Sequence, residues 1–172
     1  MSARGMVRSR SSAIFPTHND LAENVRGSMV DLLDARLADA IDLQTQMKQA
    51  HWNVKGPTFF PLHELFDKIA EDVEEYVDSL AERAVQLGGG VHGTARQVAS
   101  RSTIPEYPGA RDGRQHVEAA AMALATFGRG VRAAIDQADG AADRDTADLF
   151  TEVSRGVDKW LWFVEAHLQT ER

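Results

Sequence analysis

Hydrophobic residues recur every three or four positions along most of the chain, with polar residues between them. This spacing places the hydrophobic side chains on one face of an α-helix. Four such segments follow one another, at residues 19–53, 58–87, 115–138 and 143–168. No segment shows the strict alternation that is typical of a strand, so the pattern predicts an all-α fold built from four amphipathic helices.

The signals that end the first two helices lie where the hydrophobic pattern stops. Gly56-Pro57 ends the first helix, because Pro cannot continue the hydrogen-bond ladder and Gly accepts unusual dihedrals. Thr58 is placed to cap the second helix, and Gly88-Gly89-Gly90 ends it. The first two helices are therefore expected to form a hairpin with a short turn.

The third and fourth helices carry their own packing and capping signals. Gly128 and Gly130 are poor helix formers and indicate close packing of the third helix against a neighbour. Asp143 or Asp145 can cap the fourth helix. The predicted inward face of the third helix carries Ala119, Met122, Ala123, Phe127, Val131 and Ile135.

The connection between the second and third helices is unusually long. It runs from Gly90 to about Gly113 and contains Pro105 and Pro108. A link of roughly 20 residues is uncommon in a small domain unless it crosses the bundle or carries a short helix. Because such a crossover is a feature of ferritin-like bundles, we expect an all-α, ferritin-like four-helix bundle with a long crossover connection between helices 2 and 3.

The N-terminal segment differs in composition from the rest of the chain. Residues 1–18 are rich in Ser and Arg and contain no acidic residue, so we expect a flexible tail before a bundle domain at residues 19–172. The apolar stretch after Arg10 is too short for a signal peptide, and no apolar run approaches the ~20 residues of a membrane span. We expect a soluble, cytoplasmic protein with no membrane partner.

Charge and cysteine content exclude several classes of function. The chain has 19 Lys and Arg against 26 Asp and Glu, a formal net charge of -7. Such a surface repels nucleic acid except at a locally basic segment, and it attracts cations. The absence of Cys excludes disulfides, zinc–thiolate sites and Cys nucleophiles.

Two pairs of candidate metal ligands lie on the second predicted helix, His63 with Asp67 and Asp78 with Glu82. The members of each pair are four residues apart, so their side chains project from the same face. Imidazole combined with carboxylate is a usual ligand mixture for iron, manganese or zinc. Each pair taken alone is also consistent with a solvated surface pair.

The length of the helix prevents one chain from closing a site with both pairs. His63 and Asp78 are 15 residues apart, which is about 22 Å along the axis, whereas metal–ligand bonds are near ~2 Å. Two antiparallel copies of the helix, related by a two-fold axis near residue 72 or 73, bring the first pair of one copy to the second pair of the other. The spacing predicts two symmetric sites across a homodimer interface.

The histidines provide a check on this interpretation. A di-metal site inside the bundle, as in a catalase-like redox enzyme, needs Glu-x-x-His on two helices, and none of the six histidines has Glu three residues before it. His51, on the apolar face at the end of the first helix, is the natural fifth ligand, or else a half-buried structural histidine. For His92, His116 and His167 we expect surface or cap positions.

Several motifs together resemble a known family. Residues 48–56 (KQAHWNVKG) resemble the first signature of the Dps family, the small ferritin-like DNA-protection proteins. The two ligand pairs, followed by residues 83–89 (RAVQLGG), resemble the second signature. The similarity extends to residues 145–148 (DTAD) and 158–163 (DKWLWF), and it covers about residues 20–168.

The resemblance implies a hollow dodecamer, assembled from two-fold dimers, with ferroxidase centres at the two-fold interfaces. Ferrous iron is oxidised there, preferentially with hydrogen peroxide, and is stored as a ferric mineral, so that DNA is protected from oxidative damage. The residues that match the ligands are, from one subunit, His51, His63 and Asp67, and, from the other, Asp78 and Glu82. The sequence does not decide between oxygen and peroxide, or whether zinc or manganese competes with iron.

The resemblance also suggests roles around the centre. Trp52 adjoins His51, and it would intercept radicals or donate an electron, unless it only packs at the interface. Acidic residues at the start of the fourth helix would line three-fold pores that admit iron, although acids there also complement the helix dipole. The candidates are Asp143, Asp145 and Asp148.

DNA binding is expected through the N-terminal tail, which carries Arg4, Arg8 and Arg10. Three cations on one tail bind weakly, but twelve tails on one particle would act multivalently and associate the protein with the nucleoid. The main alternative is a nucleoid-structuring protein whose metal sites only brace the dimer. The number of irons taken up per subunit distinguishes the two functions, because storage requires many irons and a bracing site saturates at one or two.

Overall fold

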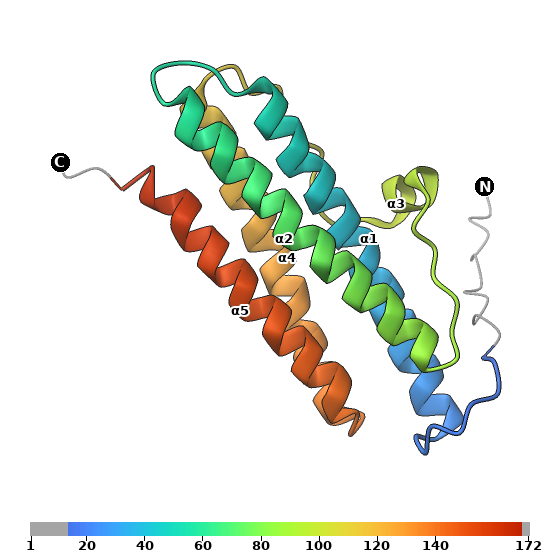
Figure 1. Cartoon of the computed structure of the whole chain (residues 1–172). Helices are drawn as coiled ribbons and strands as arrows, with labels where there is room; N and C mark the ends of the chain where they lie inside the picture. Colours follow the sequence, from blue (N-terminus) through green and yellow to red (C-terminus); the bar gives the residue numbers. More distant parts are fainter. Residues whose placement is uncertain (1–13, 170–172) are drawn as a thin grey trace, which may run out of the picture.

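The computed structural model describes residues 14–169, and within this range the regular structure is entirely helical. Four long helices form the bundle and a short one lies in the crossover (Figure 1). Their bounds are α1 Glu23–Asn53, α2 Phe59–Gln86, α3 Ala95–Arg101, α4 Gly113–Gly140 and α5 Arg144–Ala166. The predicted four-helix bundle with a long crossover between its second and third long helices is confirmed. None of the described helices combines the length and apolarity that a bilayer crossing requires.

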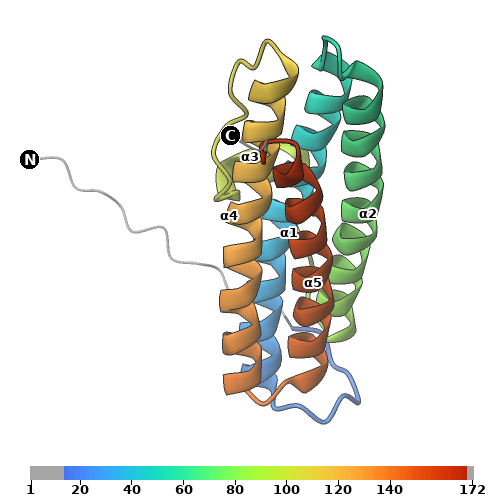
Figure 2. The same cartoon turned by 90° about the vertical axis from the view of Figure 1, so that its left-hand side faces the viewer.

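The crossover returns along the full length of the bundle. Arg26, near the start of α1, donates a hydrogen bond to the Leu87 carbonyl at the end of α2, over 2.9 Å. The first residue of α4, Gly113, lies instead beside Thr58 at the α1–α2 turn. The chain therefore travels from one end of the bundle to the other between α2 and α4, and these two helices run parallel. Figure 2 shows the four long helices side by side, and Figure 1 shows α3 outside the bundle.

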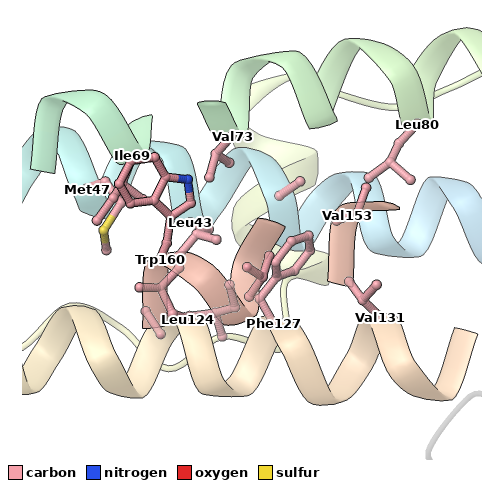
Figure 3. Close-up of a cluster of buried hydrophobic side chains, with 14 of the residues drawn as sticks. Leu43, Met47, Ile69, Val73, Leu80, Leu124, Phe127, Val131, Val153 and Trp160 are labelled. Carbon is pink, nitrogen blue, oxygen red and sulfur yellow. The ribbon is translucent and has the colours of Figure 1, made fainter. Parts of the chain in front are cut away.

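The core lies where the inward faces of the four long helices meet (Figure 3). Each helix contributes aliphatic or aromatic side chains that are almost completely removed from water, which is the main favourable contribution to folding. The residues labelled in the figure are Leu43, Met47, Ile69, Val73, Leu80, Leu124, Phe127, Val131, Val153 and Trp160. The Trp160 indole also donates a hydrogen bond to Asp72, so that α5 is tied to α2 at this point.

The structure corrects the sequence prediction on α4. Met122 was predicted to point inward, but its side chain is 60% exposed. At 100° per residue it lies nearly opposite Ala120, which is fully buried and sits at the middle of the inward face. Gly128 lies against Val157 of α5, as its predicted close packing requires.

The start of the first helix was predicted less accurately than its end. The first helix begins at Glu23, four residues after the predicted start. Thr58 occupies the N-cap position of α2, as predicted, but its side chain makes no capping hydrogen bond. Asp143, one of the two candidates, caps α5 by accepting from the Thr146 backbone N–H.

Two carboxylates of α1 hold the crossover in place. Asp34 accepts hydrogen bonds from His92, before α3, and from Arg101, at its end. Asp39 accepts from the Thr103 backbone N–H and forms an ion pair of 2.8 Å with Arg36. Both carboxylates are buried, so their hydrogen bonds offset the cost of removing charge from water.

We predict that Asp39→Ala lowers the free energy of unfolding by about 3 kcal/mol, because it leaves a largely buried guanidinium and a backbone N–H without their acceptor. Asp31→Ala, on an exposed part of the same helix, is the matched control and should change it by less than about 0.5 kcal/mol. Urea denaturation of both variants measures the difference. Equal midpoints would show that Asp39 does not hold the crossover.

Candidate metal centre

The α1–α2 turn brings two of the predicted ligands into direct contact. His51 lies in the last turn of α1 and His63 in the first turns of α2. The turn between them is short because Gly56 adopts a φ of 106°, which only glycine accepts readily. The two imidazole rings stack with their centroids 3.7 Å apart and their planes 21° from parallel.

Hydrogen bonds determine the tautomer of both rings. Nδ1 of His51 lies 2.9 Å from the backbone carbonyl of His63, and Nδ1 of His63 lies 2.9 Å from the carbonyl of His51. A carbonyl only accepts, so each Nδ1 must carry a hydrogen and donate. In the neutral rings both Nε2 atoms therefore keep a free lone pair, which is the form in which histidine binds metals.

Asp67 lies next to this pair and is paired with a cation. Its carboxylate is 3.8 Å from Nδ1 of His51 and contacts the ammonium group of Lys48. The hydrogen bond from Lys48 holds the pKa of Asp67 below its ordinary value, with smaller contributions from the two histidines. The carboxylate is thus ionised and ready to bind a cation, but Lys48 competes for it.

Lys48 is a residue of the site to which sequence reasoning gave no role. It was noted only as the first residue of the KQAHWNVKG motif. The signal was available, because Lys48 precedes His51 by three residues and so lies on the same face of α1, opposite an acidic residue of α2.

The second predicted pair lies in the other half of α2. Asp78 and Glu82 are both exposed, whereas the neighbouring Leu80 is fully buried. Within residues 14–169, no group of three or more His, Asp or Glu side chains is close enough to hold a metal ion by itself. One subunit therefore brings His51, His63 and Asp67 to one end of the bundle and leaves the other two acids about 22 Å along the helix.

The acids at the start of α5 do not share one environment. Asp143 is 2% exposed and accepts hydrogen bonds from Thr146 and from Arg83 of α2, the latter over 2.9 Å. Its carboxylate thus joins the end of α2 to the start of α5. Asp145 is 89% exposed and Asp148 is also exposed, so only these two present their charge to solvent. The role of the three in a pore stays a prediction.

The remaining predictions concern the tail and the other histidines. Arg4, Arg8 and Arg10 lie outside the described residues. His92 is exposed and His167 is the C-cap residue of α5, as expected. The expectation for His116 was wrong, because its side chain is 1% exposed and its Nδ1 lies 2.6 Å from the Tyr107 hydroxyl. Trp52, beside His51, is 66% exposed.

Comparison with known proteins identifies the family. Residues 30–172 match the ferritin-like domain family. The chain is 42% identical over 154 residues to the DNA protection during starvation protein of Agrobacterium fabrum, covering 89% of this chain and 95% of that protein. DpsC from Streptomyces coelicolor superposes with a TM-score of 0.87 at 31% identity and covers 94% of each chain. Dps from Mycobacterium smegmatis gives a TM-score of 0.85 at 30% identity, covering 92% of this chain and 94% of that one. The chain therefore belongs to the Dps family of ferritin-like proteins.

Proposed function

We propose that this protein oxidises ferrous iron at centres shared between two subunits and stores the product as a ferric mineral in a dodecameric cage. The observation that carries the proposal is the His51–His63 pair, whose Nε2 atoms are both free for metal, beside the ionised carboxylate of Asp67. These groups, together with Asp78 and Glu82, form a mixture of imidazole and carboxylate that suits iron. Iron is the substrate here, and it is also the stored product.

The shared centre follows from the helix face on which the ligands lie. Successive rotations of 100° place His63, Asp67, Asp78 and Glu82 on one stripe of α2, which is separate from the buried face that carries Phe66. Two copies of this stripe, packed antiparallel about residues 72 and 73, would join the histidine half of one subunit to the acidic half of the other. Such a contact is isologous and gives two equal centres per dimer.

Carboxylates at the centre favour oxidation, because they stabilise the more highly charged ferric ion over the ferrous ion. Two ferrous ions each lose one electron to hydrogen peroxide, which takes up two protons and leaves as two water molecules. We propose peroxide as the preferred oxidant. The reaction removes ferrous iron and peroxide together, and these are the reactants that generate hydroxyl radicals.

Protection of DNA is the proposed purpose of this chemistry. Several relatives of the chain are named DNA protection during starvation proteins, including the one from Agrobacterium fabrum. We propose that the chain acts in the same way in the cytoplasm, near the nucleoid. Arg4, Arg8 and Arg10 are the residues proposed to contact DNA, and twelve copies of the tail on one particle would add their weak affinities.

The first test is anaerobic loading of the purified protein with ferrous iron, followed by addition of hydrogen peroxide. We expect ferric absorbance to continue to many irons per subunit, and we expect His51→Ala/His63→Ala to abolish the rapid phase. Asp78→Asn/Glu82→Gln should do the same, because it removes the other half of each centre. Saturation at one or two irons, without mineral growth, would instead favour a nucleoid-structuring protein whose metal sites brace the dimer.

Mixing the two double variants tests whether the centre is shared. A dimer with one subunit of each kind has one centre that lacks all four mutated ligands and one that is fully intact. After dissociation and random reassembly, about one quarter of the wild-type centres should return. No recovery from verified mixed cages would contradict a centre built from two subunits.

Lys48→Met should strengthen the binding of the first metal ion by up to about fivefold, because it removes the cation that competes for Asp67. The substitution should also let the pKa of Asp67 rise toward its ordinary value, since Lys48 is the main cause of its lowering. Anaerobic calorimetry with ferrous iron measures the change in affinity, and an NMR titration of the metal-free protein measures the pKa.

Lys68→Met is the matched control for this measurement. Its ammonium group pairs with Glu71 and Asp72 on the same helix and makes no contact with Asp67. The variant removes the same charge from the residue next to Asp67 in the sequence but should leave the first binding step nearly unchanged. Weaker binding in Lys48→Met would show that Lys48 supports the centre instead of competing with iron.

Asp145→Asn/Asp148→Asn should slow iron uptake without abolishing oxidation, because the two exposed acids are proposed to draw cations toward the cavity. Stopped-flow comparison at low and high ionic strength measures this, and the difference from wild type should shrink as salt screens the charges. Asp143 is left unchanged, because its substitution would disrupt the cap of α5. Equal uptake rates at low salt would exclude the pore role.

A further inference from the structure

Tyr107 and His116 form a hydrogen-bonded pair that the proposed iron centre does not use. Tyr107 lies in the crossover after α3, and His116 lies in the first turn of α4. The Tyr107 hydroxyl is 2.6 Å from Nδ1 of His116, and the two rings stack with centroids 6.0 Å apart. His116 is buried, whereas Tyr107 is half-buried and lines a surface cavity.

The surroundings set the direction of this hydrogen bond. Burial raises the pKa of Tyr107 to about 12, so the phenol keeps its proton at neutral pH. Desolvation lowers the pKa of His116. This effect is larger than that of the hydrogen bond to the Asn53 backbone, which raises the pKa. Because the contact with the Asn53 backbone favours a ring N–H, we assign the ring proton to Nε2, although the geometry there falls short of a full hydrogen bond among the described residues. Nδ1 is then left to accept from the Tyr107 hydroxyl.

The cavity beside Tyr107 is lined in part by residues that neighbour the candidate metal centre. It has a volume of about 620 Å³, and its lining includes Tyr107, Trp52 and Lys48. Trp52 follows His51 directly in the sequence, and Lys48 contacts Asp67. An exposed indole beside the iron ligands and a phenol bonded to a buried base thus line one space.

We propose that Tyr107 is a one-electron oxidation site, with His116 as its proton acceptor, and that it takes oxidising equivalents from Trp52. This source rests on the proposed function, in which peroxide reacts at the neighbouring centre. Where only one ferrous ion is bound, it supplies one electron to peroxide and Trp52 supplies the second, so that peroxide takes up two protons and leaves as two water molecules while the indole becomes a radical cation. Tyr107 gives an electron to the indole radical cation of Trp52, which returns to neutral indole. The phenolic proton moves to Nδ1 of His116, leaving a neutral tyrosyl radical and an imidazolium ion, so that charge is conserved.

A further ferrous ion restores the pair. It gives one electron to the tyrosyl radical and becomes ferric, while the proton returns from Nδ1 to the phenolic oxygen. The short hydrogen bond matters, because an oxidised phenol is a much stronger acid than imidazolium, and a base already in contact lets the proton leave with the electron. An oxidising equivalent that escapes the centre would thereby be consumed by oxidising a ferrous ion, and it would not reach DNA.

Tyr76, the other tyrosine of the chain, provides an internal comparison. It is also half-buried, and burial also raises its pKa. Its hydroxyl packs against Gly156 of α5, and within the described residues it makes no hydrogen bond to a histidine. Tyr76 is therefore comparably buried but has no hydrogen-bonded histidine to accept its proton, and the nearby carboxylates of Asp72 and Glu152 only add to the rise of its pKa.

Pulse radiolysis of the metal-free, assembled protein with azide radicals tests the transfer without iron. Azide radicals oxidise the exposed indoles of Trp52 and Trp162, and the absorption bands of the tryptophan and tyrosine radicals then report electron transfer to tyrosine. We expect tyrosyl growth in the wild type and in Tyr76→Phe, and its loss in Tyr107→Phe and in Trp52→Phe. Tyrosyl growth that persists in Tyr107→Phe, or that is absent from the wild type, would overturn the proposal.

The role of His116 is tested by the same measurement in heavy water. Transfer coupled to proton movement should slow several-fold in D₂O in the wild type, which needs no variant to fold. His116→Gln should slow tyrosyl growth while leaving oxidation of the indole unchanged. Equal rates in both solvents would reduce His116 to a structural partner and overturn the assignment. Because no iron is present, these results are independent of whether the protein is a ferroxidase.

Discussion

The return of the crossover along the whole bundle determines which surfaces of the α1–α2 hairpin remain open. It forces α4 to start beside the α1–α2 turn, so that the α4–α5 pair covers one side of the hairpin along its length. The side chains on that side, such as Phe66 and Val73, become the core. The polar stripe of α2 is left uncovered, and the candidate ligands lie on it. Asp34 and Asp39, which fasten the crossover, thus support the site without touching it.

The candidate centre divides into two halves of different character. The histidine half is held by reciprocal hydrogen bonds to backbone carbonyls, so its geometry is fixed within one subunit. The acidic half, Asp78 and Glu82, is exposed and has no comparable support. Joining two acidic stripes would be unfavourable without cations, since Glu71, Glu74 and Glu75 lie along the same helix. Under the proposed function, bound iron would supply part of the charge that balances this interface.

Much of the fold could be predicted from hydrophobic periodicity, because burial of one helix face is the dominant contribution to stability. The same reasoning failed for Met122, since an apolar residue at a plausible spacing can still lie opposite the centre of the buried face. It also missed the burial of His116, whose environment is created by the crossover residue Tyr107. Contacts of this kind join distant segments and leave no periodic signal.

In the candidate site, too, residue positions could be predicted from the sequence, whereas contacts between helices could not. The ligand positions were predicted from spacing and from the resemblance to the Dps family, but the competing contact of Lys48 with Asp67 was not. That contact depends on how α1 and α2 face each other, which only the packed hairpin determines. Likewise, Asp143 was grouped with Asp145 by sequence, although packing against Arg83 gives it a structural task that Asp145 does not share.

His51 and His63 lie close together along the chain, and this closeness favours their contact early in folding. Their carbonyl contacts span only twelve residues, so the loop that they close is short and its entropic cost is small. Contacts of such low sequence separation form early, before the distant helices dock. A nascent subunit would thus present paired imidazoles before it meets a partner, when borderline metals such as zinc already suit them. Under the proposed function, discrimination in favour of iron would arise later, when a second chain contributes its carboxylates.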